Sequence, residues 1–161
     1  MFYNIYLFIL LQSLFESTNG PCWSSTWEFS SGQSYCMFHG ITCNESEQTT
    51  INLQSNSLEG SLPSEIGMLL SLTFLDLDFN LINGTIPSEI GMLSSLYWLY
   101  LHQNSITGTI PTEIGMLSSL ERLVLYDNSI TGTIPTELCT LTNTFIYYDE
   151  DEISCTCIDS I

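Results

Sequence analysis

Positive charge is almost absent from this 161-residue chain. Arg122 is its single Lys or Arg, against 18 Asp and Glu, and the formal net charge is -17. Because a phosphate backbone or an anionic lipid surface is bound through several cations, this composition excludes nucleic-acid binding and electrostatic attachment to a membrane. Disorder is excluded too, since acidic disordered tails are poor in aromatics and this chain has eight Phe, eight Tyr and three Trp.

An apolar run long enough to span a bilayer comfortably is also lacking. The apolar start, MFYNIYLFILLQSLF, resembles the hydrophobic region of a signal peptide. However, no Lys or Arg precedes it and no clear small-x-small cleavage site follows. We expect residues 1–10 to be an apolar leader or the remnant of a signal or membrane anchor, with a shortened or truncated chain as the alternative.

A repeat of 24 residues is the strongest feature that is present. Each unit reads L-x-x-L-x-L-x-x-N-x-L-x-G-x-I-P-x-E-I-G-x-L, and four units fit. They cover residues 48–71, 72–95, 96–119 and 120–143. The segments NGTIPSEIGMLSSL and TGTIPTEIGMLSSL of the second and third units differ at only two of fourteen positions. A period of 20 to 29 residues with this Leu and Asn pattern predicts a leucine-rich-repeat solenoid.

Each position of the unit has a physical role in such a solenoid. The alternation around Leu99 and Leu101 predicts a short strand whose leucines point inward, and strands of successive coils pair in parallel. The recurrent Asn is expected to satisfy backbone groups in the turn that follows, and the Gly to admit a bend. The Pro precedes a convex segment in which Ser or Thr and then Glu suit a helical first turn.

The L-x-G-x-I-P variant of the unit resembles the plant-type leucine-rich repeat of receptor ectodomains, receptor-like proteins and polygalacturonase-inhibiting proteins. The resemblance covers residues 11–143 and implies an α/β solenoid, a right-handed superhelix with a parallel concave sheet and about four 24-residue coils plus caps. Trp27 and the segment 36–60 are similar to that family's N-terminal cap. We therefore expect an N-terminal cap over 11–47 and a C-terminal cap over 144–161.

The six cysteines lie in two groups near the two ends of the chain. The resemblance implies a disulfide between Cys36 and Cys43, whereas a cysteine at Cys22 departs from the family pattern. At the other end we expect Cys139 to pair with Cys155 or Cys157, the latter being the preferred partner. A metal site at the C-x-C pair lacks a second pair of His or Cys. Asn44 and Asn83 begin possible glycosylation sequons.

The outward positions of the predicted strands are the places where the repeats differ, and they gather aromatic and charged side chains on the concave face. The predicted ligand-binding residues are Phe74, Asp76, Asp78, Trp98, Tyr100, His102, Arg122 and Tyr126. Aromatic side chains and Arg on rigid strands are typical of interface anchors. The alternative is that the aromatics only pair across strands and stabilise the sheet.

Catalysis is not expected, and neither is a cofactor. Asp78 and His102 fall in one column and are expected to approach each other, but no Ser or Cys nucleophile adjoins them. An open ribbon also supplies no water-excluding pocket, and with Asp76 the pair would hold a cation only weakly. A ladder of Thr107-Gly-Thr109 over Thr131-Gly-Thr133 offers an alternative surface for ice or polysaccharide.

The sequence therefore predicts a secreted or cell-surface binding module for a protein, peptide or glycan, with a co-receptor as a possible partner. Membrane anchoring through the N-terminal segment is the second expectation for its location. The alternatives for its function are a structural or adhesive cell-wall component and a truncated receptor fragment. Receptor signalling by this chain alone is not implied.

Overall fold

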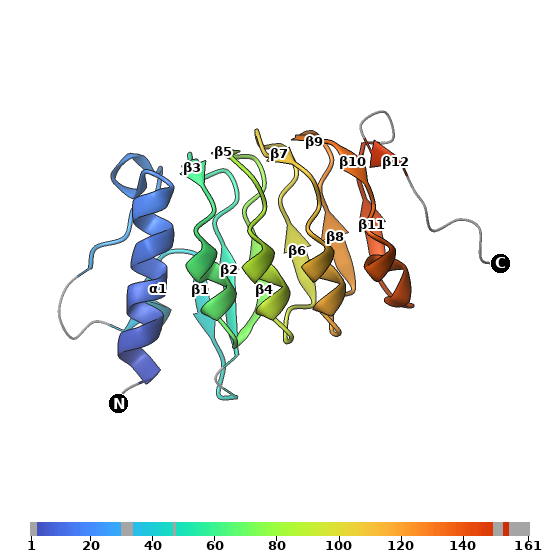
Figure 1. The fold of residues 1–161 in the computed structure, drawn as a ribbon. Helices are drawn as coiled ribbons and strands as arrows, with labels where there is room; N and C mark the ends of the chain where they lie inside the picture. Colours follow the sequence, from blue (N-terminus) through green and yellow to red (C-terminus); the bar gives the residue numbers. More distant parts are fainter. Residues whose placement is uncertain (1–2, 30–33, 47, 150–152, 155–161) are drawn as a thin grey trace.

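The structure, a computed structural model, describes residues 3–29, 34–46, 48–149 and 153–154. Stacked coils form a row that starts against helix α1 (Tyr3–Ser17), and each coil adds one strand to a main sheet (Figure 1). Across the row, 3-10 helices cover one side of the coils and a second set of short strands lies along one flank. This architecture confirms the predicted leucine-rich-repeat solenoid.

The main sheet has six strands in the order β1-β2-β4-β6-β8-β11. They are β1 (Ile41–Cys43), β2 (Thr49–Asn52), β4 (Leu72–Asp76), β6 (Trp98–Tyr100), β8 (Arg122–Val124) and β11 (Phe145–Tyr147). Every pair from β2 to β11 is parallel, as the repeat predicts. The pair β1–β2 is antiparallel, because β1 belongs to the N-terminal cap and joins the sheet as a hairpin outside the repeats.

The flank carries three short parallel pairs. They are β3 (Glu59–Ser61) with β5 (Leu81–Asn83), β7 (Thr107–Gly108) with β9 (Ser129–Ile130), and β10 (Gly132–Thr133) with β12 (Ile153–Ser154). The chain turns here at Gly84, Gly108 and Gly132, whose φ angles are 72°, 79° and 101°. Residues other than Gly rarely adopt this backbone conformation, which explains the glycine in each unit.

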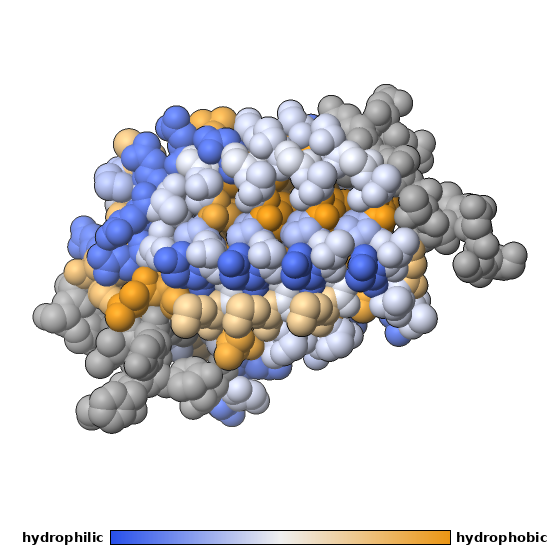
Figure 2. All heavy atoms as spheres, viewed as in Figure 1, coloured by the Kyte–Doolittle hydropathy of each residue, from blue (hydrophilic) through white to orange (hydrophobic). Residues whose placement is uncertain are grey.

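A 3-10 helix follows the proline of each unit, as predicted for the convex side. On this face, hydrophilic and apolar residues recur in rows from one coil to the next (Figure 2). The four are η3 (Ser64–Met68), η4 (Ser88–Met92), η5 (Thr112–Met116) and η6 (Thr136–Thr140), and two shorter ones, η1 (Gly20–Cys22) and η2 (Tyr35–Met37), lie in the cap. The glycine within η3, η4 and η5 permits close stacking, because a Cβ on Gly91 would collide with the backbone oxygen of Glu113 in the next coil.

The core is a stack of aliphatic side chains, with Leu75, Leu99 and Leu123 fully buried one above another. The recurrent asparagine completes it. Asn104 donates from Nδ2 to the carbonyls of Leu77, Leu101 and His102 at 3.0–3.2 Å, and its Oδ1 accepts from the N–H of Ile82 at 2.9 Å. Such bonds satisfy the backbone at the turn and join neighbouring coils.

The N-terminal cap covers the first coil with α1 and a cluster of rings. Leu10, Leu11 and Leu14 of α1 are buried, and the helix continues through residue 10, so no structural boundary separates the expected leader from the cap. Trp27 stacks on Phe38 at 5.3 Å and donates to a backbone carbonyl at 2.8 Å. None of the helices in the described ranges combines the length and apolarity that a membrane crossing requires.

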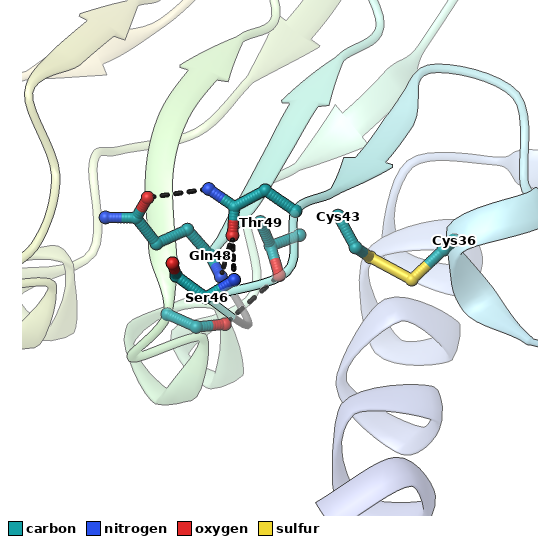
Figure 3. The surroundings of a disulfide bond; sticks show 7 residues. Cys36, Cys43, Ser46, Gln48 and Thr49 are labelled. Atoms are coloured by element: carbon teal, nitrogen blue, oxygen red, sulfur yellow. Dashed lines mark hydrogen bonds between the residues drawn. A yellow bond between two sulfur atoms is a disulfide. The ribbon is translucent and has the colours of Figure 1, made fainter.

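A disulfide joins Cys36 to Cys43 beside the turn that carries Ser46 and Gln48 (Figure 3). This is the pairing that the resemblance implies. Cys139 is disulfide-bonded as well, but Cys155 and Cys157 lie outside the described residues. Cys22 is a free, exposed thiol.

Candidate functional site

The outward side chains of the main sheet form three rows that run across the coils, here called ranks, and each rank holds the residues at equivalent positions of successive repeats. In the first rank, the parallel register sets Phe74, Trp98 and Arg122 side by side on β4, β6 and β8. The rings of Phe74 and Trp98 meet edge to face with centroids 5.7 Å apart, and the Arg122 guanidinium carbon lies 6.0 Å from the Trp98 ring centroid. Trp98 is still 40% exposed. Three predicted binding residues are therefore brought together at the surface.

The second rank holds Asp76, Tyr100 and Val124. The Tyr100 ring lies 5.6 Å from that of Phe74, which joins the first two ranks into one aromatic cluster. Asp76 was predicted to stand on the surface, but it is only 5% exposed. Burial raises the pKa of Asp76 to about 6; a hydrogen bond from the Asp78 N–H opposes this rise, and the nearby Asp78 carboxyl adds to it.

The third rank holds Asp78, His102 and Tyr126. Asp78 Oδ2 lies 3.2 Å from His102 Nε2, which confirms the expected approach of these two side chains. The sequence predicts both on the outward face as binding residues, but they are largely covered there, since Asp78 is 3% exposed and His102 is 9% exposed. Two rings lie against the imidazole, with Phe79 at 5.3 Å and Tyr126 at 4.5 Å between ring centroids. Exposed binding groups are therefore concentrated in the first rank.

A groove of about 490 Å³ opens beside the first rank. It is lined by Thr50, Thr73, Phe74, Tyr97, Trp98 and Glu121. Tyr97, Thr73 and Glu121 were not predicted as binding residues, although they occupy a column one position before the first rank and the repeats differ there as well. The variation between repeats at these positions is the sequence signal that could have identified the three residues as surface residues of interest. The groove is open to solvent and is therefore not a water-excluding pocket of the kind that catalysis needs.

The two charged residues beside the groove, Glu121 and Arg122, differ in the contacts that they make. The backbone of Glu121 is fixed between two strands, because its N–H donates to Tyr97 O at 2.8 Å and its carbonyl accepts from Phe145 N at 2.9 Å. Its carboxylate side chain is exposed. Across the described ranges, no carboxylate lies within 4.0 Å of the Arg122 guanidinium, which instead lies over the Trp98 ring.

The buried pair of Asp78 and His102 is a poor catalytic centre. Asp78 Oδ1 and His102 Nδ1 are enclosed and have no hydrogen-bond partner among the described residues, so neither presents a reactive atom at the surface. A weak cation site with Asp76 was considered from the sequence, but no group of three or more His, Cys, Asp or Glu within the described part of the chain is suited to holding a metal ion.

Two other predicted surfaces lie away from the main sheet. Asn44 and Asn83, which begin the sequons, are both exposed. On the flank, Thr107 and Thr131 are exposed too, but their hydroxyls donate to the Gly84 and Gly108 carbonyls at 3.0 and 3.4 Å. Since these hydroxyls bond to the neighbouring coil, the threonine ladder has a structural role.

Comparison with known sequences identifies the repeat. The family described as Leucine Rich Repeat matches residues 49–69, 71–93, 95–117 and 119–141, more than half of the chain. A probable leucine-rich-repeat receptor-like serine/threonine-protein kinase of Arabidopsis thaliana is 42% identical over 52 residues, which are 32% of this chain and 7% of that protein. The chain thus spans a small part of that relative, and the matching region consists of leucine-rich repeats.

Solved structures show the same architecture. A chain of the BIR3–SERK2 complex from Arabidopsis thaliana is similar with a TM-score of 0.77 and 33% identity, covering 91% of this chain and 81% of that one. The plant peptide hormone receptor RGFR1, in complex with RGF2, is similar with a TM-score of 0.60 and 33% identity over 62% of this chain and 16% of the receptor. Both likenesses are to plant leucine-rich-repeat ectodomains.

Proposed function

The chain belongs to the leucine-rich repeat family, and from this premise we propose that it is a non-catalytic module that binds a protein or peptide ligand on the outward face of its main sheet. The observation that carries this proposal is the aromatic cluster of Phe74, Trp98 and Tyr100, held on adjacent strands and still open at Trp98. Rigid aromatics bury a large area at low entropic cost, which makes them typical interface anchors.

The similar proteins support the same function. One of them is a plant peptide hormone receptor in complex with RGF2, and another is part of a two-protein complex. Partners of these two kinds, a peptide or a second ectodomain, are therefore the ones that we propose for this chain. The cross-strand aromatic pairing considered from the sequence is present as well, and it supports the proposal by making the cluster rigid.

We place the module outside the cell or at its surface. The disulfide between Cys36 and Cys43 favours an oxidising compartment, as does the bonded state of Cys139. Exposure of Asn44 and Asn83 leaves both sequons accessible to glycosylation. Peptide mapping of the secreted chain under non-reducing conditions tests these modifications together.

A selection with the secreted chain tests the binding proposal. The chain is immobilised and used to select from a phage-displayed library of random peptides, and retained clones are measured on a Trp98→Ala/Tyr100→Ala variant. We expect that variant to lose at least tenfold in affinity, since interface anchors typically contribute more than about 1 kcal/mol each. Met92→Ala, a change at an exposed residue of η4, is the matched control. Circular dichroism and thermal melting verify that each variant is folded.

Two other patterns of binding would contradict the proposal. If the retained clones bind the aromatic variant as tightly as the wild type and lose binding to Met92→Ala, the ligand uses the convex side. Retention of a neutral cell-wall glycan, with no peptide retained at all, would favour the structural or adhesive alternative.

A further inference from the structure

We propose that the groove beside the first rank receives a basic side chain, Arg or Lys, of the bound peptide. This inference rests on the proposed function and deepens it by naming the chemistry of the ligand. It draws on three observations: the aromatic walls of the groove, the carboxylate at its rim, and the charge of the molecule.

The walls suit a long side chain that ends in a cation. Phe74, Tyr97 and Trp98 line the groove, and Tyr97 and Trp98 are 41% and 40% exposed. The methylene stem of Lys or Arg packs on such rings, while the cationic head is attracted to the face of an aromatic ring. The molecule already holds one such contact, since the Arg122 guanidinium lies 6.0 Å from the Trp98 ring centroid. A volume of about 490 Å³ is sufficient for one long side chain and part of its neighbours.

Glu121 supplies the opposite charge for the cationic head. Glu121 is one of the residues that line the groove, together with the aromatic residues, and its side chain is exposed. Its backbone is hydrogen-bonded on both sides, to Tyr97 and to Phe145, so the point from which the Glu121 side chain extends is fixed before a ligand arrives. Binding then orders the side chain of Glu121 and not its backbone, and a guanidinium can pair with this carboxylate in a bidentate manner.

The net charge of the whole molecule also favours a cationic ligand. At a net charge of -17 the surface attracts cationic partners and repels anionic ones. Arg122 is the one cation in the chain and stands next to the groove, so it opposes a cationic guest and favours an anionic one. This gives a sharp expectation: replacing Arg122 strengthens the binding of a cationic ligand and weakens that of an anionic ligand.

Three pools of random nonapeptides test the proposal. Their central residue is Arg, its neutral isostere citrulline, or Glu, and each pool is passed over the immobilised full chain and quantified by mass spectrometry. The variants are Glu121→Gln, Arg122→Gln and Glu65→Gln. The last removes the same charge from η3 on the convex side and controls for the general attraction of an acidic protein. We expect the Arg pool to exceed the citrulline pool about fivefold to tenfold on the wild type.

The results on the three variants decide whether the basic side chain of the peptide binds in the groove. In support, the excess of Arg over citrulline falls to about twofold on Glu121→Gln, persists on Glu65→Gln and increases on Arg122→Gln. An equal fall on Glu65→Gln overturns the proposal, because the attraction is then not local. A preference for the Glu pool, or retention of a neutral oligosaccharide that depends on Trp98 but not on Glu121, overturns it as well.

Failure of this inference is distinguishable from failure of the proposed function. If all three pools bind equally and the Trp98→Ala/Tyr100→Ala variant loses them, the face binds peptides without using a basic side chain. If no pool is retained and the phage selection also yields nothing, both proposals fail.

Discussion

His102 Nε2 lies 3.2 Å from Asp78 Oδ2, and this contact joins the turns of two neighbouring coils at one edge of the main sheet. Both side chains are buried, and the second polar atom of each, Asp78 Oδ1 and His102 Nδ1, has no hydrogen-bond partner in the described part of the chain. The contact between them is therefore important to both groups, although the Asp76 carboxyl also lies near that of Asp78. A buried polar group that loses such a contact keeps the full cost of its desolvation.

Replacing His102 is expected to destabilise the fold strongly. His102→Ala leaves the Asp78 carboxyl buried and unpaired, and we expect the free energy of unfolding to fall by about 3 kcal/mol in urea titrations. Gln103→Ala, at an exposed neighbour, should change it by less than about 0.5 kcal/mol. Adding Asp78→Asn to His102→Ala should recover part of the loss. Equal effects of the His102 and Gln103 variants would show that the buried contact contributes nothing.

Asp76 is expected to make stability fall as the pH rises. Because its pKa is raised to about 6 from 3.8, the folded state holds a proton that the unfolded state has released between about pH 4 and pH 6. Across that window the free energy of unfolding decreases with increasing pH, and above it the carboxylate is ionised at a cost. We expect Asp76→Asn to stabilise the fold by about 1–2 kcal/mol at pH 7.5 and to have no effect at pH 3.5.

The control for Asp76 is the same charge change at the exposed Asp127. Urea titrations of Asp127→Asn should show a difference from wild type that stays small and varies little across this pH range. A gain for Asp76→Asn that is as large at pH 3.5 as at pH 7.5 would mean that the effect comes from packing and not from ionisation.

The repeat pattern was enough to predict the coils, because their determinants are local and recur. The inward leucines, the recurrent asparagine and the glycine at positive φ all lie where the pattern predicts. The antiparallel pairing of β1 and β2 could not be predicted, since the cap does not repeat and its entry into the sheet depends on how it covers the first coil.

The candidate site was predicted less completely. Alternation shows that Asp78 and His102 leave the core face, but not that Phe79 and Tyr126 then cover them. Whether an outward side chain is exposed depends on the size and orientation of its neighbours in adjacent coils. Glu121 and Tyr97 were missed for a different reason: they precede the strand, and only the three-dimensional arrangement shows that they close a groove with Trp98.

Removing one recurrent asparagine is expected to weaken the stack. Asn104→Ala deletes four hydrogen bonds to buried or partly buried backbone groups in three segments. Leaving such groups unsatisfied should lower the free energy of unfolding by about 2–4 kcal/mol. Asn143→Ala, at an exposed position before β11, is the matched change and should have little effect. If the two variants unfold at the same urea concentration, the asparagine does not hold the coils together.

The glycine within η4, Gly91, is expected to tolerate no side chain. Gly91→Ala places a Cβ against the backbone oxygen of Glu113, and backbone cannot move aside as a flexible side chain can. We expect a loss of about 1–3 kcal/mol, which thermal melting would show as a lower midpoint. Ser94→Ala, at an exposed position two residues after η4, serves as control. A midpoint for Gly91→Ala that matches this control would indicate that the coils can separate at little cost.

The disulfide of the cap offers a test with an internal control, because the cap also contains a free cysteine. Cys36→Ser/Cys43→Ser opens a covalent loop with a sequence separation of 7, and the chain-entropy relation gives a loss of about 2.5 kcal/mol. Cys22→Ser changes an exposed thiol that has no partner and should alter the free energy of unfolding by less than about 0.5 kcal/mol. Urea titrations without reductant measure both. An equal loss in the two variants would mean that the cap depends on thiol packing and not on the covalent loop.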